Sequence, residues 1–204
     1  IEFMNYISEH NFNYREFKVY LKSRNTPTYI FTDNDKFKDA ILHNNLFNKN
    51  PYENDCSQLT HYILRKIEEN IRTSKQENIK IISSLTREHI MPQSWFEYWP
   101  LNGVYYTEQD TEEALKTWEP TEVQKSIVKR CSLINTLGNL TLLTQSLNSD
   151  KEVSNKGFDI KGPRIVAQSS LELNKYFQRP KWDEEEIMNR GVILFNYAKD
   201  VWTY

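Results

Sequence analysis

Two stretches decide the fold of this chain: LTREHIMPQSW at residues 85–95 and LGNLTLLTQSLNSDKEVSNK at residues 137–156. The first closes a segment rich in β-branched residues, and Met91-Pro92 stops regular pairing after it, so we predict a strand over 85–90. The second stretch predicts another strand over 137–144, followed by a short helix over 145–156. The middle of the chain should therefore run strand, long insertion, strand, short helix.

Polar side chains gather at the ends of these elements. Glu88 and His89 end the first strand, Asn139 opens the second, and Asn148 lies in the short helix nine positions later. Adjacent strand residues point to opposite faces, so Glu88 and His89 can converge only if the strand ends there, as the following Pro92 indicates. By helical spacing, Asn148 should share one face of the short helix with Lys151, Glu152 and Asn155.

These residue types suit phosphodiester hydrolysis. A neutral histidine such as His89 can take a proton from water near pH 7. Carboxylate and amide oxygens such as those of Glu88 and Asn148 suit Mg²⁺ or Mn²⁺, which would neutralise charge on the phosphorus and the leaving oxygen. Residue types alone leave open that His89 is simply structural. The other three histidines lack such surroundings, and we expect solvated or capping roles for His10, His43 and His61.

Helices are expected on both sides of this middle region. Apolar residues recur at helical spacing around the strands, and Asp33, Thr121 and Asp183 are suitable N-caps. The segment 93–120 is aromatic and irregular, and we expect most of it to extend the core. The predicted fold is mainly α with a small β-hairpin, and the expected helices cover residues 9–24, 33–47, 55–73, 121–135 and 183–202.

Composition limits the function classes. The chain has 204 residues, 38% of them hydrophobic and 26% charged, with a formal net charge of −2, which argues against a basic protein that coats DNA non-specifically. No apolar run of eighteen residues and no signal peptide is visible, so we expect a cytoplasmic protein without a membrane span. Two cysteines without close spacing, Cys56 and Cys131, predict reduced thiols and no structural zinc site.

The motifs EHIMPQSW (88–95) and LGNLTLLTQSLNSDKEVSNKGFDIK (137–161), with Trp182, Ile187 and Arg190 further on, resemble a known family. It is the C-terminal HNH domain of GmrSD-type modification-dependent (type IV) restriction enzymes, a domain also found in SspE-like and BrxU-like phage-defence proteins. The resemblance covers roughly residues 10–204. It implies a ββα-metal (His-Me finger, HNH) core embedded in a helical domain, and a metal-dependent DNA endonuclease that acts against phage or other foreign DNA.

The resemblance also implies roles for single residues, and the HNH domain of RNA-guided DNA nucleases has the same spacing. His89 would be the general base, Asn139 would orient the loop that carries it, and Glu88 and Asn148 would be the metal ligands. With Asn148 where many relatives have histidine, the site should favour Mg²⁺ (or Mn²⁺) over Zn²⁺. Three lysines would contact phosphate, with Lys161 preferred because it matches the family's F-x-x-K element: Lys151, Lys156 and Lys161.

Alternatives remain for several of these residues. Glu88 could instead pair with Arg87, and Asp150 is a rival metal ligand. Gly138 is expected to be a backbone requirement, and Pro92 and Trp95 to be structural. Two other functions also stay open: a catalytically inactive DNA-binding or interaction module with an HNH-like shape, and a structural metal finger.

The expected organisation follows from the same resemblance. Residues 1–3 precede Met4 and look like an expression scar, residues 4–80 form an N-terminal helical region, residues 81–161 hold the HNH core with an insertion at 93–136, and residues 162–204 are helical again. Full-length relatives carry a nucleotide-dependent ParB-like domain, and no phosphate-binding G-x-x-x-x-G-K-[ST] loop occurs here. We therefore expect that this chain is a fragment or that a partner subunit supplies that domain.

Overall fold

The computed structural model describes residues 8–9, 13–23, 25–26, 29–30, 33–46, 57–72, 84–150, 153 and 156–202. The chain divides into two compact units, residues 1–37 and 38–204. The described part is mainly helical, as the sequence predicted, and it contains two short antiparallel strand pairs, one of which was predicted. No helix in this described part is long and apolar enough to cross a bilayer.

The first unit contains a helix and a short strand pair. Helix α2 (Tyr14–Ser23) confirms the helix expected over 9–24. It is followed by β1 (Asn25–Thr26) and β2 (Tyr29–Ile30), an antiparallel pair that the sequence did not predict. Helix α3 (Asn34–His43) then begins after Asp33, whose Oδ1 accepts a hydrogen bond from the Lys36 amide at 2.8 Å, so the predicted cap is confirmed.

The second unit is built on the two strands that the motifs predicted. Strand β3 (Leu85–His89) pairs antiparallel with β4 (Leu140–Thr144), with His89 opposite Leu140 and Leu85 opposite Thr144. The expected start of the second strand was wrong, because Leu137–Asn139 form a 3-10 turn, η2, in front of β4. Helix α7 (Gln145–Asn148) follows at once and is shorter than expected, with Asn148 as its last residue.

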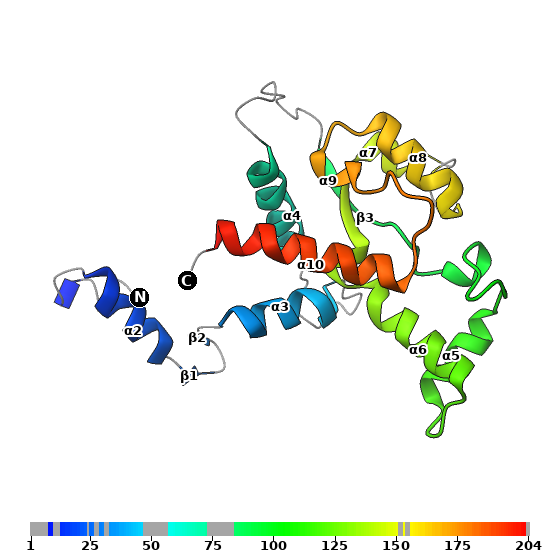
Figure 1. The fold of residues 1–204 in the computed structure, drawn as a ribbon, viewed down its shortest axis with the longest axis horizontal. Helices are drawn as coiled ribbons and strands as arrows, with labels where there is room; N and C mark the ends of the chain where they lie inside the picture. The colour runs from blue at the N-terminus through cyan, green and yellow to red at the C-terminus, as the bar shows by residue number, and fades with distance from the viewer. Residues whose placement is uncertain are drawn as a thin grey trace. The chain divides into compact units, whose positions relative to one another are not determined.

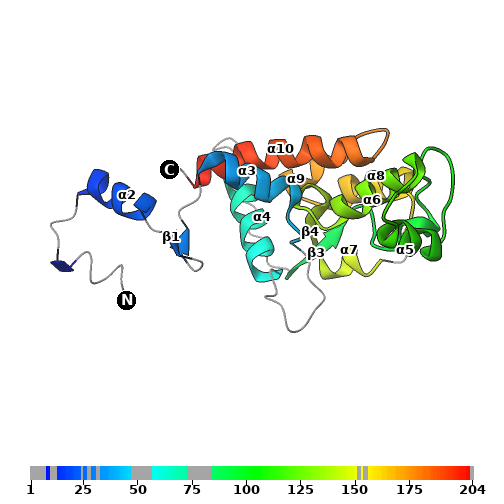
Figure 2. The ribbon, with the colours of Figure 1, turned by 90° about the horizontal axis from the view of Figure 1, so that it is seen from below.

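Long helices pack against this strand pair. Helix α10 (Glu184–Val201, red in Figures 1 and 2) contacts η2 directly in front of β4, and it also contacts α4 (Ser57–Ile71) and α6 (Glu122–Ile134). Helix α4 also contacts both strands. Thr121 and Asp183 cap α6 and α10 by accepting hydrogen bonds from the backbone amides of Gln124 and Glu186, as predicted. The two strands therefore lie under helices from both halves of the chain.

Several helices were not predicted. The 3-10 turn η1 (Trp95–Glu97) and helix α5 (Glu108–Lys116) lie in the segment expected to be irregular. Helix α8 (Phe158–Gln168) begins inside the motif 137–161, and α9 (Glu172–Lys175) lies in the region from 162 on that was expected to be helical but in which no separate helix was predicted at this place. Helix α8 runs across the boundary expected between 161 and 162, and it contains Pro163, which sequence reasoning takes as a helix breaker.

The core is aromatic, as expected. The cluster of buried side chains includes Met91, Trp95, Trp99, Phe177 and Trp182. From the 93–136 insertion the cluster takes Trp95, Trp99, Leu101, Ala114, Ile127, Leu133 and Ile134, all at most 5% exposed, so this part of the insertion extends the core as predicted. Other large apolar side chains of the insertion are exposed: Trp118 has 94% of its surface exposed, and Tyr98, Val104, Tyr105, Leu115 and Val123 have 45–62%.

Candidate active site

Asn139 ties down the loop that follows His89. Its side-chain Oδ1 accepts a hydrogen bond from the Met91 amide at 2.9 Å, and its Nδ2 donates to the carbonyls of Met91 and Ile134, both at 2.8 Å. Its backbone carbonyl accepts from the Ile90 amide at 3.0 Å. Because Asn139 is fully buried, these bonds satisfy polar groups that water cannot reach, and they fix the course of the chain directly after His89.

The C-terminal part of the chain supports this turn. The guanidinium of Arg190 donates to the carbonyls of Gly138 at 2.8 Å and Leu140 at 2.7 Å. Burial lowers the pKa of Arg190 to about 9, which still leaves it charged at neutral pH. A Cβ at Gly138 would lie 2.2 Å from the carbonyl oxygen of Ile187, so the predicted backbone requirement for glycine is confirmed.

His89 is the last residue of β3, and its ring contacts a side chain at the end of α6. Its Nε2 lies 3.0 Å from Oδ1 of Asn135, and the same oxygen accepts a hydrogen bond from Nε2 of Gln93 at 3.1 Å. Since this oxygen acts as an acceptor for both, His89 donates through Nε2, and a neutral ring then has its lone pair on Nδ1. The side chain of His89 is partly exposed, so solvent can reach it.

Glu88 is paired with a buried lysine from α8. Nζ of Lys161 donates to Oε1 of Glu88 at 2.6 Å and to the backbone carbonyl of His89, also at 2.6 Å. The Lys161 side chain is fully buried, whereas that of Glu88 is 18% exposed. Burial lowers the pKa of Lys161, and the charge of Glu88 acts in the opposite direction.

Asn148 lies against the same strand. Its Nδ2 donates to Oγ1 of Thr86 at 2.9 Å and to the carbonyl of Arg87 at 3.4 Å. Thr86 and Glu88 share one face of β3 because side chains alternate along a strand. The amide oxygen of Asn148 and Oε2 of Glu88 accept no hydrogen bond from the described residues, and both are hard oxygen donors of the kind that Mg²⁺ takes.

The residues predicted for the site thus fall into two groups. Asn148 contacts β3 at Thr86, and Glu88 contacts α8 through Lys161. The ring of His89 contacts Asn135, at the end of α6. Lys161 joins the groups through the carbonyl of His89. Within the described ranges, no three His, Cys, Asp or Glu side chains gather as a metal site, so a cation here would take its remaining ligands from water or substrate.

A comparison with protein families identifies the family of this chain. The family of GmrSD restriction endonucleases, C-terminal domain, matches residues 31–197. The chain belongs to this family. Membership implies a DNA nuclease that acts in defence, and it confirms the resemblance drawn from the motifs. No curated protein and no solved structure matches the chain.

Sequence reasoning missed some contacts of this GmrSD C-terminal domain. Asn135 carried no signal, because only the fold brings it to His89, 46 residues earlier in the chain. Gln93 lies inside the quoted motif, but nothing in the sequence indicated its partner. The possible pairing of Glu88 with Arg87 does not occur, because Arg87 donates to the carbonyl of Leu46 while Glu88 accepts from Lys161.

The three predicted phosphate lysines have different surroundings in the GmrSD C-terminal domain. Lys151 lies outside the described residues. Lys156 is half-buried, and its backbone carbonyl accepts a hydrogen bond from the indole of Trp99 at 2.9 Å. Lys161 is fully buried, so it could reach a phosphate only by breaking both of its hydrogen bonds. The rival metal ligand Asp150 is paired with Arg164 at 3.3 Å.

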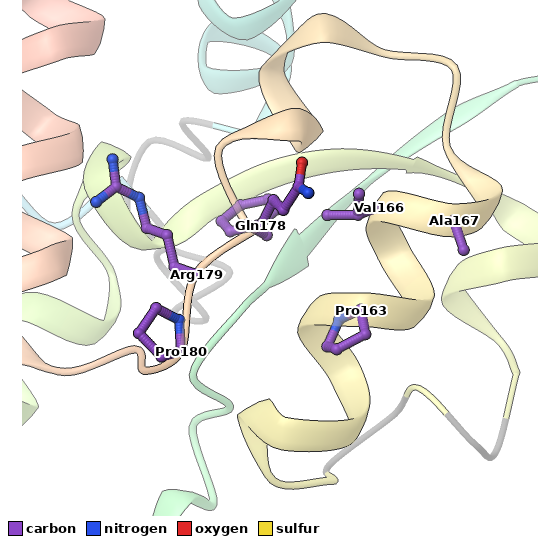
Figure 3. A pocket seen from close by; sticks show the side chains of 7 residues that line it. Pro163, Val166, Ala167, Gln178, Arg179 and Pro180 are labelled. Carbon is purple, nitrogen blue, oxygen red and sulfur yellow. The ribbon is translucent and has the colours of Figure 1, made fainter.

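Two cavities lie among the described residues of the GmrSD C-terminal domain without including the predicted base or metal ligands. One of about 450 Å³ lies between α8 and the segment 177–180, and Figure 3 shows Pro163, Val166 and Gln178 on its walls. Another of about 520 Å³ lies beside Tyr98 and Trp182. Neither of these two cavities has His89, Glu88 or Asn148 among the described residues that line it.

Proposed function

We propose that this GmrSD C-terminal domain is a metal-dependent DNA endonuclease of the HNH type, in which a water activated by His89 attacks the phosphodiester. The observation that carries the proposal is the hydrogen bonding of Asn139. It fixes the turn after His89, and it does so in an antiparallel strand pair followed by a helix that ends at Asn148. That is the order of elements expected of a ββα-metal core.

His89 supplies the base. With Nε2 donating to Asn135, Nδ1 carries the lone pair that takes the proton of the attacking water. In this proposal the attacking water lies beyond the end of β3, where the ring of His89 and the Glu88 carboxylate of the other face would both have to reach it. The strand end is therefore the place where base and ligand can act on one phosphate.

Glu88 and Asn148 would hold the cation. Oε2 of Glu88 and Oδ1 of Asn148 are oxygen donors from the same side of β3, and they suit Mg²⁺ or Mn²⁺ better than Zn²⁺. A bound cation would neutralise charge on the phosphorane and on the leaving oxygen. The Asn148 amide is oriented for this because its nitrogen donates to Thr86 and Arg87.

The substrate in this proposal is phage or other foreign DNA. Recognition of modified DNA and control by nucleotide would come from a ParB-like domain or a partner subunit. Lys151 and Lys156 remain proposed phosphate contacts. The formal net charge of −2 fits a division of labour in which this domain cuts DNA but does not capture it alone.

A supercoiled-plasmid assay tests the function. We expect nicked or linear product with Mg²⁺ or Mn²⁺, and none with EDTA. An inactive DNA-binding module would instead shift DNA in a strongly salt-dependent way without metal-dependent product. Chelation would strongly lower the melting temperature of a structural metal finger, whereas it would leave the melting temperature of the proposed nuclease unchanged.

A further inference from the structure

The ammonium group of Lys161 is buried in the interior beside the proposed metal ligand. Its side chain has an exposed fraction of 0%, although lysine normally keeps its charge in water. Both of its hydrogen bonds, to Oε1 of Glu88 and to the carbonyl of His89, measure 2.6 Å, which is short even for charge-assisted bonds. The charge is therefore fixed in place between two consecutive residues of the site.

Such burial is costly, so packing alone does not account for it. Removing an ammonium from water costs several kcal/mol, and replacing a buried ion pair by apolar residues of similar volume is often neutral or stabilising. A methionine would fill the same space in α8 without that cost. What an apolar residue would not do is hold a carboxylate and a carbonyl at fixed positions.

We propose that Lys161 is a positioning residue for catalysis, which fixes the Glu88 carboxylate and the backbone of His89 relative to each other. This inference rests on the proposed function. Lys161 binds Oε1 of Glu88, and Oε2, which accepts no hydrogen bond from the described residues, is left available for a cation. By binding the carbonyl of His89, it fixes the strand end from which the imidazole extends. Lys161 thus acts through Glu88 and His89 and does not touch the DNA.

Amine footprinting of the unaltered protein tests this placement. The protein is treated with an acetylating reagent with and without plasmid DNA, and modified lysines are identified by mass spectrometry. Lys175 and Lys181, whose side chains are 62% and 58% exposed, should react and serve as positive controls. We expect Lys161 to stay unmodified in both conditions. Modification in the free protein with protection by DNA would overturn the inference.

Kinetics of Lys161→Met test the positioning role. Loss of an outer residue that orients a metal ligand typically costs about 10- to 100-fold in activity, so kcat should fall by that factor. The KM for DNA should stay within about twofold, and the salt slope of binding should not change, because no phosphate contact is lost. The matched control is Lys175→Met, which removes an exposed lysine from α9 and should leave kcat unchanged.

The outcomes separate this inference from the proposed function. An unchanged kcat in Lys161→Met, or a higher KM with a salt slope lowered by about one, would overturn the positioning role. A wild-type protein without metal-dependent cleavage would instead overturn the proposed function. Footprinting needs neither activity nor a variant, so it decides the placement of Lys161 even where Lys161→Met does not fold.

Discussion

The indole Nε1 of Trp182 donates a hydrogen bond of 3.0 Å to Oδ1 of Asn139, although 43 residues separate them. Both side chains are buried. The ring of Trp182 also packs against Phe158 and Phe177, with centroids 5.7 and 5.1 Å away. The residue that holds the loop after His89 is therefore itself held by the C-terminal part of the chain.

We expect Trp182→Phe to lower the free energy of unfolding by about 1 kcal/mol through loss of the indole donor. The smaller buried area of the phenylalanine ring lowers it further. The loss stays modest because Oδ1 of Asn139 still accepts from the Met91 amide. Urea denaturation measures it. The matched control is Trp118→Phe, at a side chain that is 94% exposed, and it should leave stability unchanged. Equal stabilities for both variants would contradict the role given to Trp182.

Gly138→Ala tests the close approach of η2 to α10. The new Cβ would lie 2.2 Å from the carbonyl oxygen of Ile187, and this atom belongs to a helix backbone that cannot turn aside. We expect a loss of about 3 kcal/mol in urea denaturation, at the upper end of the usual cost of overpacking. Gly103→Ala is the comparison: its φ of 80° is strained for alanine but its surroundings are open, so it should cost about 1 kcal/mol. A smaller loss at Gly138 than at Gly103 would show that η2 is not pressed against α10.

A pair of variants at Asn135 tests how the ring of His89 is held. Asn135→Leu keeps the side-chain size but removes the oxygen that accepts from His89 and Gln93. With the tautomer no longer fixed, we expect kcat for plasmid cleavage to fall about 100-fold, the order of a general base's contribution. Asn135→Asp keeps an acceptor oxygen, so its kcat should stay within about tenfold of the wild-type value. If the two variants had equal kcat at equal melting temperatures, Asn135 would not set the ring's orientation.

The sequence was most informative where local signals decide the structure. The β-branched run before Glu88 and Pro92 after it gave β3, and Thr121 and Asp183 marked the beginnings of α6 and α10. Each of these signals lies within a few residues of the element that it predicts. The role proposed for Asn139 likewise came from the motif, and its hydrogen bonds to Met91 are those that such a role requires.

Long-range packing explains the errors. Apolar residues at helical spacing predicted α4, but two of them, Leu59 and Tyr62, are 52% and 48% exposed, whereas the buried face includes Thr60 and Glu68. Thr60 donates to the carbonyl of Leu46, and Glu68 accepts from the first amides of α9, including that of Leu173. These partners lie far away in the sequence, so polar residues on a buried face could not be recognised.

The burial of a charged side chain is the other property that could not be predicted from the sequence. Lys161 was expected to contact phosphate because lysine normally lies at the surface and the F-x-x-K element suggested it. Its position on α8 directs the ammonium inward to Glu88 instead. Pro163 and Gly162 next to it also concealed the helix itself, since both residues usually interrupt helices.

The most direct test of the account is cleavage of supercoiled plasmid by His89→Ala with saturating Mg²⁺, compared with wild type and with His43→Ala. His43 is exposed on α3 and contacts Asp39, so its loss should not affect cleavage. We predict metal-dependent cleavage by wild type and His43→Ala, and a loss of at least about 100-fold in His89→Ala at an unchanged melting temperature. Wild-type cleavage rates in His89→Ala would contradict the central claim that this imidazole activates the attacking water.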